Sequence, residues 1–222
     1  MEYKINIKTD HPIAYDSPDH THPWGTKRDN KIEFSYVDEI CKYYDRQINF
    51  LDLGCAGGRL AVEMAERGHI SVGLEGSDYS IKHERPYWPD YHKKNLFTCD
   101  ITKPFEVQHD NEIVQFDMIN AWEVLEHIHK DDLPMLFDNI YKHLKPGGIF
   151  VCSVCWASDT PTGVQLHLTR KTAPWWITMF QEHNFIPIGN KIDVNKQKCN
   201  YLFKHRNRGK IGRCQFWMTW TK

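Results

Sequence analysis

The chain has 222 residues, of which 41% are hydrophobic and 26% charged, with a formal net charge of −1 and a pI near 6.9. This composition is ordinary for one globular domain, and the balanced charge provides no overall field to attract nucleic acid or anionic lipid. The longest apolar run, residues 149–157, is shorter than the ~20 residues of a membrane span, and the first ten residues contain no apolar signal core. We therefore expect a cytoplasmic protein that does not associate with membranes.

Residues 1–46 are expected to form an N-terminal arm and a lead-in helix, and residues 47–222 a single globular domain. The first 30 residues are rich in His, Pro, Asp and Gly, which predicts irregular structure. Their polar side chains, which include His20 and His22, are compatible with a lid over a ligand or with a simple tail. Apolar residues then recur at helical spacing, at Phe34, Val37, Ile40, Cys41 and Tyr44.

From residue 48 onward, strand-like and helix-like segments alternate. Short apolar runs predict seven strands, at INFLDL, ISVGLE, NLFTCDI, FDMINAW, the run from residue 149, FIPIG and CQFWMTW. The clearest helix is expected to be capped by Asp131 or Asp132 and to stop at KPGG, residues 145–148, and Thr172 with Pro174 opens a later one. This alternation predicts an α/β fold with a mostly parallel sheet and helices on both faces.

The seven cysteines are scattered through apolar segments, which predicts reduced, buried thiols. Cys152 and Cys155 have the C-x-x-C spacing, but they lie within a predicted strand. Because residues three apart on a strand point to opposite faces, this spacing predicts neither a zinc site nor a redox site.

A glycine-rich turn, LDLGCAGG at residues 51–58, follows the first predicted strand. Glycines allow the backbone to bend sharply and to approach a ligand closely. Glu75 ends the second strand, 21 residues after Gly54, where a carboxylate can accept hydrogen bonds from a ribose. The glycines alone also suit an ordinary tight turn, whereas the turn together with the acid predicts a nucleoside-containing ligand.

In an ordered series of segments, the chain resembles the class I, Rossmann-like S-adenosylmethionine-dependent methyltransferases. LDLGCAGG resembles their first motif, although Ala56 replaces the middle glycine; VGLEGSD, CDI, FDMINAWEVLEHI and LKPGGIF resemble the later ones. The resemblance implies a seven-stranded sheet with an antiparallel last strand and S-adenosylmethionine as the cofactor. It also implies a set of cofactor-binding residues, namely Asp52, Gly54, Ala56, Gly58, Glu75, Gly76, Ser77, Asp100, Ile101, Asn120 and Trp122.

Two other interpretations of the glycine turn remain open. A nicotinamide-dependent oxidoreductase also uses a glycine turn and a ribose acid, but here Gly54 is followed by Ala56 and Arg59, which departs from G-x-G-x-x-G. A binding module that retains the cofactor pocket without catalysis is the second alternative. A P-loop is disfavoured because no GKS or GKT segment follows the glycines.

A hydroxyl or protonated amine that accepts a methyl group needs a base. Glu126 and His127 follow the fourth predicted strand, and His167 lies in the loop after the fifth, so we name these three as catalytic candidates. Each also suits a structural role, such as positioning or packing a loop. A divalent metal is compatible with the histidines and with Asp131 and Asp132, but no spacing demands one, and helix capping accounts for both aspartates.

The stretches SPDHTHPWGT and HLTRKTAPWW loosely resemble methyltransferases found beside glycan-building enzymes, which implies a sugar hydroxyl or another small molecule as acceptor. A small-molecule or protein N-methyltransferase is the alternative. A nucleic-acid target is disfavoured because the fourth strand ends in NAWE rather than N/D-P-P-Y. The basic residues 204–213 suit a solvated hairpin loop or, alternatively, a site for phosphate or a nucleotide-sugar diphosphate. The tryptophans predict either an aromatic platform for the acceptor or core packing. Nothing in the sequence indicates an oligomeric state.

Overall fold

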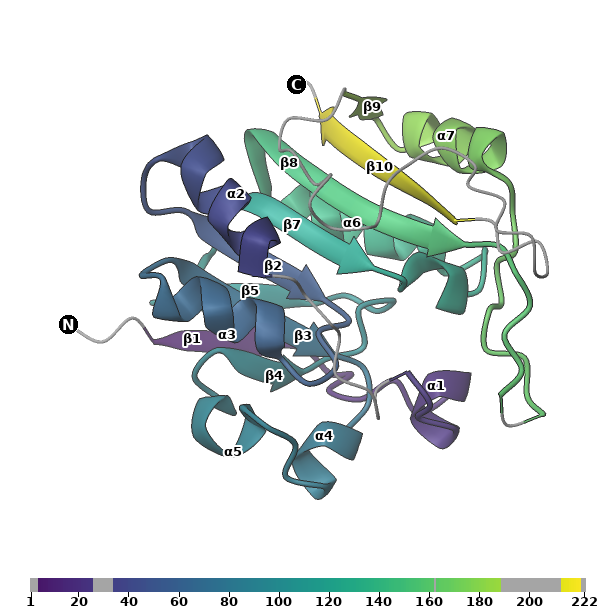
Figure 1. Cartoon of the computed structure of the whole chain (residues 1–222), viewed down its shortest axis with the longest axis horizontal. Helices are drawn as coiled ribbons and strands as arrows, with labels where there is room; N and C mark the ends of the chain where they lie inside the picture. Colours follow the sequence, from purple (N-terminus) through teal and green to yellow (C-terminus); the bar gives the residue numbers. More distant parts are fainter. Residues whose placement is uncertain (1–3, 26–33, 162, 189–212, 221–222) are drawn as a thin grey trace.

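The structure is a computed structural model that describes residues 4–25, 34–161, 163–188 and 213–220, the last eight and residues 34 and 35 as backbone only. Seven strands form the central sheet (Figure 1). Their spatial order is β4 (Leu96–Thr98), β3 (Ile70–Glu75), β2 (Asn49–Leu53), β7 (Phe116–Trp122), β8 (Leu144–Cys155), β10 (Arg213–Trp220) and β9 (Phe185–Pro187).

The first five strands in this order are parallel to one another, and β10 runs antiparallel to both of its neighbours. The predicted sheet, mostly parallel with an antiparallel last strand, is therefore confirmed. Strands β2, β3 and β4 follow one another outward to one edge of the sheet, whereas β7 and β8 extend toward the other edge. The order of the strands therefore changes direction between β2 and β7, where Asp52 pairs with Asn120. A ligand site is expected beyond the carboxyl ends of the strands at such a switch point.

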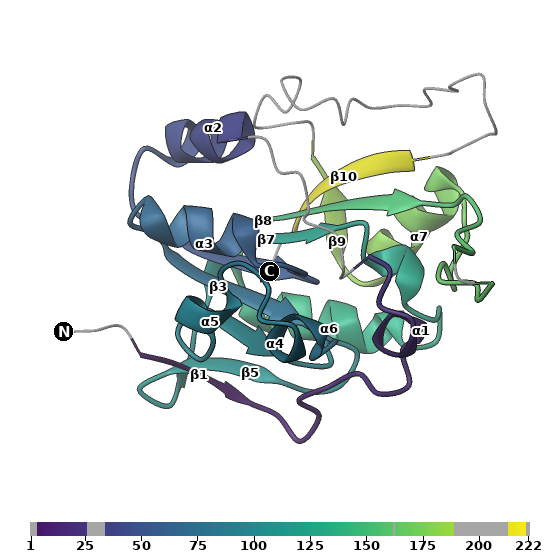
Figure 2. The ribbon, with the colours of Figure 1, turned by 60° about the horizontal axis from the view of Figure 1, so that its bottom comes forward.

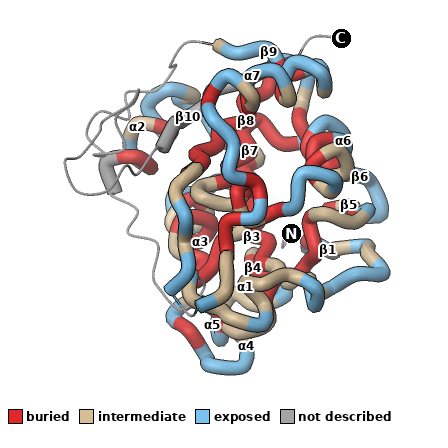
Figure 3. The backbone as a smooth tube through the Cα atoms, turned by 90° about the vertical axis from the view of Figure 1, so that its right-hand side faces the viewer, coloured by how far each residue is buried: buried red, intermediate tan, exposed pale blue. Residues whose placement is uncertain are grey.

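Helices cover both faces of the sheet (Figure 2). One face packs against α2 (Phe34–Tyr44) and α3 (Arg59–Glu66), and the other against α6 (Leu133–His143) and α7 (Ala173–Glu182). The side chains of β8 alternate between the two faces, because successive residues of a strand point to opposite sides. Ile149 and Val151 belong to the cluster with α2, whereas Phe150 and Val154 belong to the cluster with α6. Most of β7 and β8 is accordingly buried (Figure 3).

The two ends of α6 differ from the sequence-based expectation. Asp132 occupies the predicted N-cap position, but its side chain makes no capping hydrogen bond. The helix ends at His143, and the KPGG segment already belongs to β8, where the pairing with β7 is irregular between Phe116 and Met118. The segment that was expected to stop the helix thus begins the next strand.

The N-terminal arm is more ordered than its composition predicts. Strand β1 (Ile5–Lys8) pairs antiparallel with β5 (Glu106–His109), which also pairs with β6 (Glu112–Ile113) to form a second, three-stranded sheet. The arm continues into the single-turn helix α1 (Pro18–Thr21). A local pattern could not predict this pairing, because the partners of β1 lie about a hundred residues away in the sequence.

Short helices and loops complete the described chain. Helices α4 (Tyr79–Lys82) and α5 (Trp88–Tyr91) follow β3, and the 3-10 helix η1 (Leu125–His127) follows β7. None of the helices in the described residues combines the length and apolar character needed to cross a membrane.

The cysteines whose side chains the structure describes are all free thiols. Cys41 is half-buried and the others are buried, namely Cys55, Cys99, Cys152 and Cys155. Cys199 and the side chain of Cys214 lie outside the described residues, as does the basic stretch from residue 204 apart from the backbone of Arg213.

Candidate active site

The glycine turn between β2 and α3 requires residues without side chains at two positions. Gly54 and Gly58 have φ values of 68° and 85°, in the left-handed region that glycine tolerates best. A Cβ atom on Gly54 would lie 2.5 Å from Cγ2 of Val124, and one on Gly58 would lie 2.4 Å from Cδ1 of Leu96. The turn therefore packs closely against the loop that follows β7 and against β4, with no space for a side chain at either glycine.

Glu75, at the end of β3, holds this turn in place. Its Oε2 accepts a hydrogen bond of 2.7 Å from the backbone N–H of Ala56, and its Oε1 accepts one of 3.1 Å from Ser77. Burial raises the pKa of Glu75, although its backbone hydrogen bonds oppose that shift. Ala56 itself has a φ of 47°, so an L-residue adopts a left-handed conformation where the related motif has glycine.

Asp52 and Asp100 place two more carboxyl groups near the same edge of the sheet. Asp52 is buried in β2, and burial followed by the nearby charge of Glu75 raises its pKa to about 8. Asp100 follows β4, and its Oδ1 accepts hydrogen bonds from the backbone N–H and the hydroxyl of Thr102. The next residue, Ile101, packs into the main hydrophobic core.

Two of the predicted cofactor residues contact the lead-in helix instead of the turn. Asn120 Nδ2 donates a 2.9 Å hydrogen bond to the hydroxyl of Tyr36, and the ring of Trp122 meets the Tyr36 ring edge-on at 5.5 Å. Their contacts therefore place Asn120 and Trp122 on the face of the sheet that α2 covers.

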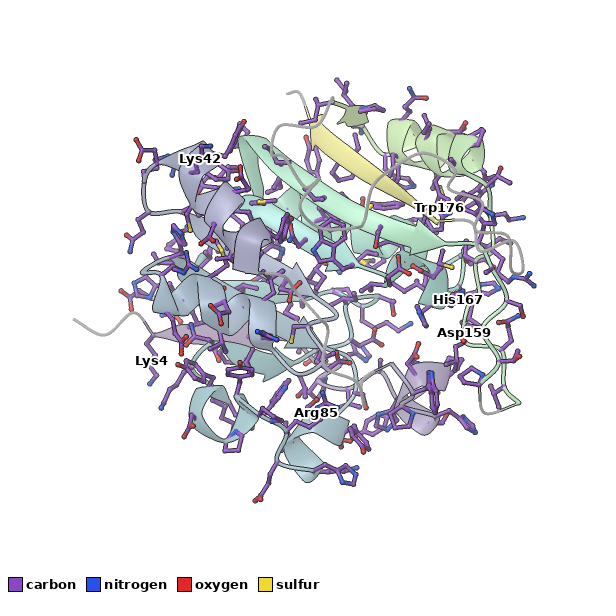
Figure 4. All side chains as sticks on the ribbon, in the orientation of Figure 1. Lys4, Lys42, Arg85, Asp159, His167 and Trp176 are labelled. Atoms are coloured by element: carbon purple, nitrogen blue, oxygen red, sulfur yellow. The ribbon has the colours of Figure 1, made fainter. Side chains whose placement is uncertain are left out.

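The three predicted catalytic residues meet at the carboxyl ends of β7 and β8. Glu126 and His127 lie on η1, and His167 lies between β8 and α7. The rings of His127 and His167 are edge to face with centroids 4.6 Å apart, and one potential ligand atom from each of the three residues lies within 4.8 Å of the others. Figure 4 shows His167 and Asp159 on the segment that follows β8. Residues 40 positions apart in the sequence thus form one polar cluster.

Glu126 is fully buried within this cluster. Its Oε1 accepts a 2.7 Å hydrogen bond from the backbone N–H of Cys155, whereas its Oε2 has no hydrogen-bond partner among the described residues. Burial raises the pKa of Glu126 well above its ordinary value, and the charge of Glu123 adds to the shift. An unsatisfied buried carboxyl oxygen is costly, so it marks a place where a proton or a cation would bind.

Two further carboxylates contact the histidines, and sequence reasoning missed both. Asp19 of α1 lies 2.7 Å from Nδ1 of His127, and Asp159 lies 3.7 Å from Nε2 of His167. Burial lowers the pKa of His127, but the hydrogen bond and charge of Asp19 outweigh it and raise that pKa above its usual value. The available signal for Asp19 was the Ser17–Pro18 helix start, which places an acid in the first turn.

The arm crosses the edge of the sheet between the two halves of this site. Ala14 N–H donates to the carbonyl of Gly76 at 2.9 Å, and the carbonyl of His11 accepts from the N–H of Asp100 at 2.9 Å. Further along, Asp19 contacts His127. Residues 9–19 therefore connect the loops after β3 and β4 to the loop after β7.

A family model described as a methyltransferase domain matches residues 26–193, which is most of the chain. The chain belongs to the class I S-adenosylmethionine-dependent methyltransferases. The methyl donor of this methyltransferase is S-adenosylmethionine. Membership of this family excludes the alternative interpretation of the glycine turn as part of a nicotinamide-dependent oxidoreductase. The buried Glu75 carboxylate suits the ribose of the donor, and the left-handed turn lets the backbone approach the adenosyl group.

Similar proteins include both N- and O-methyltransferases. Phosphoethanolamine N-methyltransferase 1 of Triticum aestivum is 29% identical over 176 residues, which is 75% of this chain and 34% of that protein. A ubiquinone biosynthesis O-methyltransferase of Rickettsia akari (strain Hartford) is 25% identical over 145 residues, 60% of this chain and 55% of that protein. The methyltransferase thus spans between about a third and just over half of the length of these two relatives.

Solved structures confirm the fold of the methyltransferase. An S-adenosylmethionine-dependent methyltransferase from Clostridium acetobutylicum ATCC 824 matches with a TM-score of 0.60 at 13% identity, covering 91% of this chain and 98% of that one.

The tryptophans were expected either to pack in the core or to form a platform for the acceptor, and two of them differ in burial. Trp176 is fully buried in the core, whereas Trp175 is partly buried with the Lys171 ammonium 5.8 Å from its ring.

Proposed function

We propose that this methyltransferase methylates a hydroxyl group of a small molecule, and that saccharides are the acceptor class to test first. The cluster of Glu126, His127 and His167 carries the proposal, because a hydroxyl must lose its proton as it accepts a methyl group. The loose resemblance of two sequence stretches to methyltransferases beside glycan-building enzymes supports the saccharide. The names of the relatives include both nitrogen- and oxygen-directed enzymes and do not decide between them.

The two halves of the site have different tasks in this proposal. When bound, S-adenosylmethionine supplies an electrophilic methyl group on a sulfonium. Glu75, with Asp52 and Asp100 nearby, holds the adenosyl part of the donor beside the turn at residues 54–58. The proximity of this turn to Val124, two residues before Glu126, supports a donor site next to the histidine cluster.

The histidine cluster positions the acceptor and removes its proton. The rings of His127 and His167 meet edge to face, so a hydroxyl that approaches this cluster can donate its proton to a ring nitrogen. The Asp19 carboxylate lies 2.7 Å from Nδ1 of His127 and so orients this ring within the cluster. Orientation of the acceptor accounts for most of the rate, since well-aligned reactants lower a barrier by ~7–11 kcal/mol.

The decisive experiment is a transfer assay with isotopically labelled S-adenosylmethionine. Matched acceptors that differ in one group, a methyl glycoside, its amino-sugar counterpart and a phenol, are each incubated with the wild-type protein and with His167→Ala. We expect label in an O-methyl ether, and a rate for His167→Ala lower by ~10²–10⁴-fold with unchanged affinity for S-adenosylhomocysteine.

Other results would contradict the proposal at different levels. Label found only in N-methyl products would overturn the oxygen-directed assignment. Tight binding of S-adenosylhomocysteine without transfer to any acceptor would favour the non-catalytic binding module.

A further inference from the structure

We infer that Glu126, His127 and His167 form a binding site for one divalent transition-metal ion. The inference rests on the proposed function and deepens it, because the ion would hold the acceptor hydroxyl. Two imidazoles and one carboxylate are a ligand set that zinc, iron and manganese use in proteins while keeping positions open. One potential ligand atom from each residue already lies within 4.8 Å of the others. Two ligands of one ion are up to ~4 Å apart, so small side-chain movements complete the site.

The Nδ1 atom of each histidine faces an oxygen, as it does in metal-binding histidines. Nδ1 of His127 faces the carboxylate of Asp19 at 2.7 Å, and Nδ1 of His167 faces the carbonyl oxygen of Ala157 at 2.8 Å. A histidine that binds a metal through one nitrogen almost always donates its other N–H to a carboxylate or a carbonyl. The carbonyl at Nδ1 of His167 favours the tautomer that leaves its lone pair on Nε2, and the Asp19 carboxylate orients the His127 ring from its Nδ1 side.

Glu126 provides an independent observation. Its Oε1 is fixed by the N–H of Cys155, and its buried Oε2 has no hydrogen-bond partner among the described residues. Leaving such an oxygen unsatisfied destabilises the folded protein. A cation between this oxygen and the two imidazoles would satisfy it. A proton on Glu126 would also remove the charge, and the experiment below separates the two cases.

A metal at this position has a defined use in the proposed reaction. The hydroxyl of the acceptor would occupy an open coordination position, and the charge of the ion would lower the pKa of that hydroxyl. The proton released from the oxygen would pass to the carboxylate of Asp159, which lies 3.7 Å from Nε2 of His167. With the ion bound, the ring nitrogens of the histidines hold the metal, so Asp159 takes the proton in place of a ring nitrogen.

The experiment measures Mn²⁺ binding to the full-length protein after treatment with a chelator. Mn²⁺ is the probe because the chain has seven cysteines, whose thiolates bind zinc but have little affinity for manganese. Electron paramagnetic resonance gives the free Mn²⁺, and calorimetry gives the affinity for S-adenosylhomocysteine on the same samples. We expect one Mn²⁺ per chain, and a loss of at least ~100-fold in affinity for Glu126→Gln and for His167→Ala.

Two more variants define the site. Asp19→Asn should weaken Mn²⁺ binding by ~10-fold, because Asp19 only orients a ligand. His129→Ala is the matched control, since His129 is exposed, lies two residues after His127 and pairs with Asp131. Its Mn²⁺ affinity should be unchanged. If Glu126→Gln does not fold, the His167→Ala result decides, because His167 lies in a loop.

The outcomes separate the metal from the proposed function. A wild-type protein that binds S-adenosylhomocysteine but no stoichiometric Mn²⁺ overturns the metal site alone. Mn²⁺ binding that survives in both Glu126→Gln and His167→Ala also overturns it, since the ion then lies elsewhere. A wild-type protein that binds no S-adenosylhomocysteine overturns the proposed function instead.

Discussion

The proposed donor side and the proposed acceptor side of this site are built in different ways. The donor side, residues 52–58 with Glu75 and Ser77, comes from one strand–helix–strand unit and is held by the backbone hydrogen bonds of a single carboxylate. The acceptor side brings together α1, η1 and the segment after β8, which contribute Asp19, Glu126 with His127, and His167. The first depends on a local turn and the second on the topology of the whole domain.

This difference decides how far each half is visible in the sequence. A turn that needs left-handed glycines leaves a pattern of adjacent residues. A cluster assembled from three distant segments leaves only single polar residues, each of which also suits a structural role. The predictions below test whether the two halves are as separate as their construction indicates, in order of expected effect.

The largest effect is expected for Glu75→Ala on donor binding. In the proposed donor site the variant would remove two hydrogen bonds between the Glu75 carboxylate and the ribose, each of which would contribute about 1.5–3 kcal/mol. The affinity for S-adenosylhomocysteine should fall by about 1,000-fold, while Mn²⁺ binding at the histidine cluster should stay unchanged. Calorimetry measures both, with the exposed Glu66→Ala on α3 as the control. Equal losses at both sites would show that the halves form one unit.

The second prediction concerns the packing of the glycine turn on the loop after β7. Gly54→Ala should lower the free energy of unfolding by about 2–5 kcal/mol, because it combines left-handed strain with a collision with Val124. Gly68→Ala is the matched control, since Gly68 has a φ of 84° and no atom within 4 Å of the added Cβ. It should cost about 1–2 kcal/mol.

Urea unfolding measures both glycine variants. The double variant Gly54→Ala with Val124→Ala should recover part of the loss, because it removes the colliding side chain. Equal losses in Gly54→Ala and Gly68→Ala would mean that the contact with Val124 does not limit the turn.

Sequence patterns predicted the main sheet well, because its strands are continuous apolar runs. The bounds of β3 and β7 coincide with the predicted ISVGLE and FDMINAW segments. The second sheet was not predicted, because β1, β5 and β6 have only two to four residues each and depend on pairing between Ile5 and His109 across the chain. Short strands without a local apolar pattern become visible only through their partners.

The same reasoning applies to the site. Glu126, His127 and His167 were singled out as reactive residue types after predicted strands, but their contact with one another depends on the parallel pairing of β7 with β8. Asp19 was missed, because the Ser17–Pro18 helix start places an acid in the first turn but does not indicate that the arm crosses the sheet to reach His127.

The third prediction concerns how the β1 end of the arm is anchored. His143 of α6 accepts a hydrogen bond from the N–H of Val107 in β5, and its Nδ1 contacts the carbonyl of Asn139, which requires a neutral ring. Burial lowers the pKa of His143 to about 4 from an ordinary value of 6.5. The unfolded chain therefore binds the proton more readily, so the stabilisation is complete above pH 6.5 and is lost as the pH falls toward 4.

Acidification over this range should cost about 3 kcal/mol through His143 alone. Urea unfolding of wild-type protein and His143→Gln at pH 7 and pH 4.5 isolates this contribution as the difference in pH dependence. The exposed His129→Gln serves as the control. If His143→Gln retains the full pH dependence of the wild-type protein, other groups cause it.

The smallest effect is expected at the other end of the arm, where Asp19 meets His127, and its pH dependence has the opposite sign. Asp19 raises the pKa of His127 in the folded protein, so this pair stabilises the fold fully below the pKa of the unfolded chain. The stabilisation is lost as the pH rises through the folded pKa.

In chelator-treated protein, Asp19→Asn should therefore lower the free energy of unfolding by about 1–2 kcal/mol at pH 6 and by much less at pH 9. Asp16→Asn, an exposed carboxylate in the same arm, should have no effect at either pH. If Asp19→Asn lowers the free energy of unfolding equally at both pH values, Asp19 acts through packing. The contact between the arm and the acceptor side would then depend on packing and not on the charge of the Asp19–His127 pair.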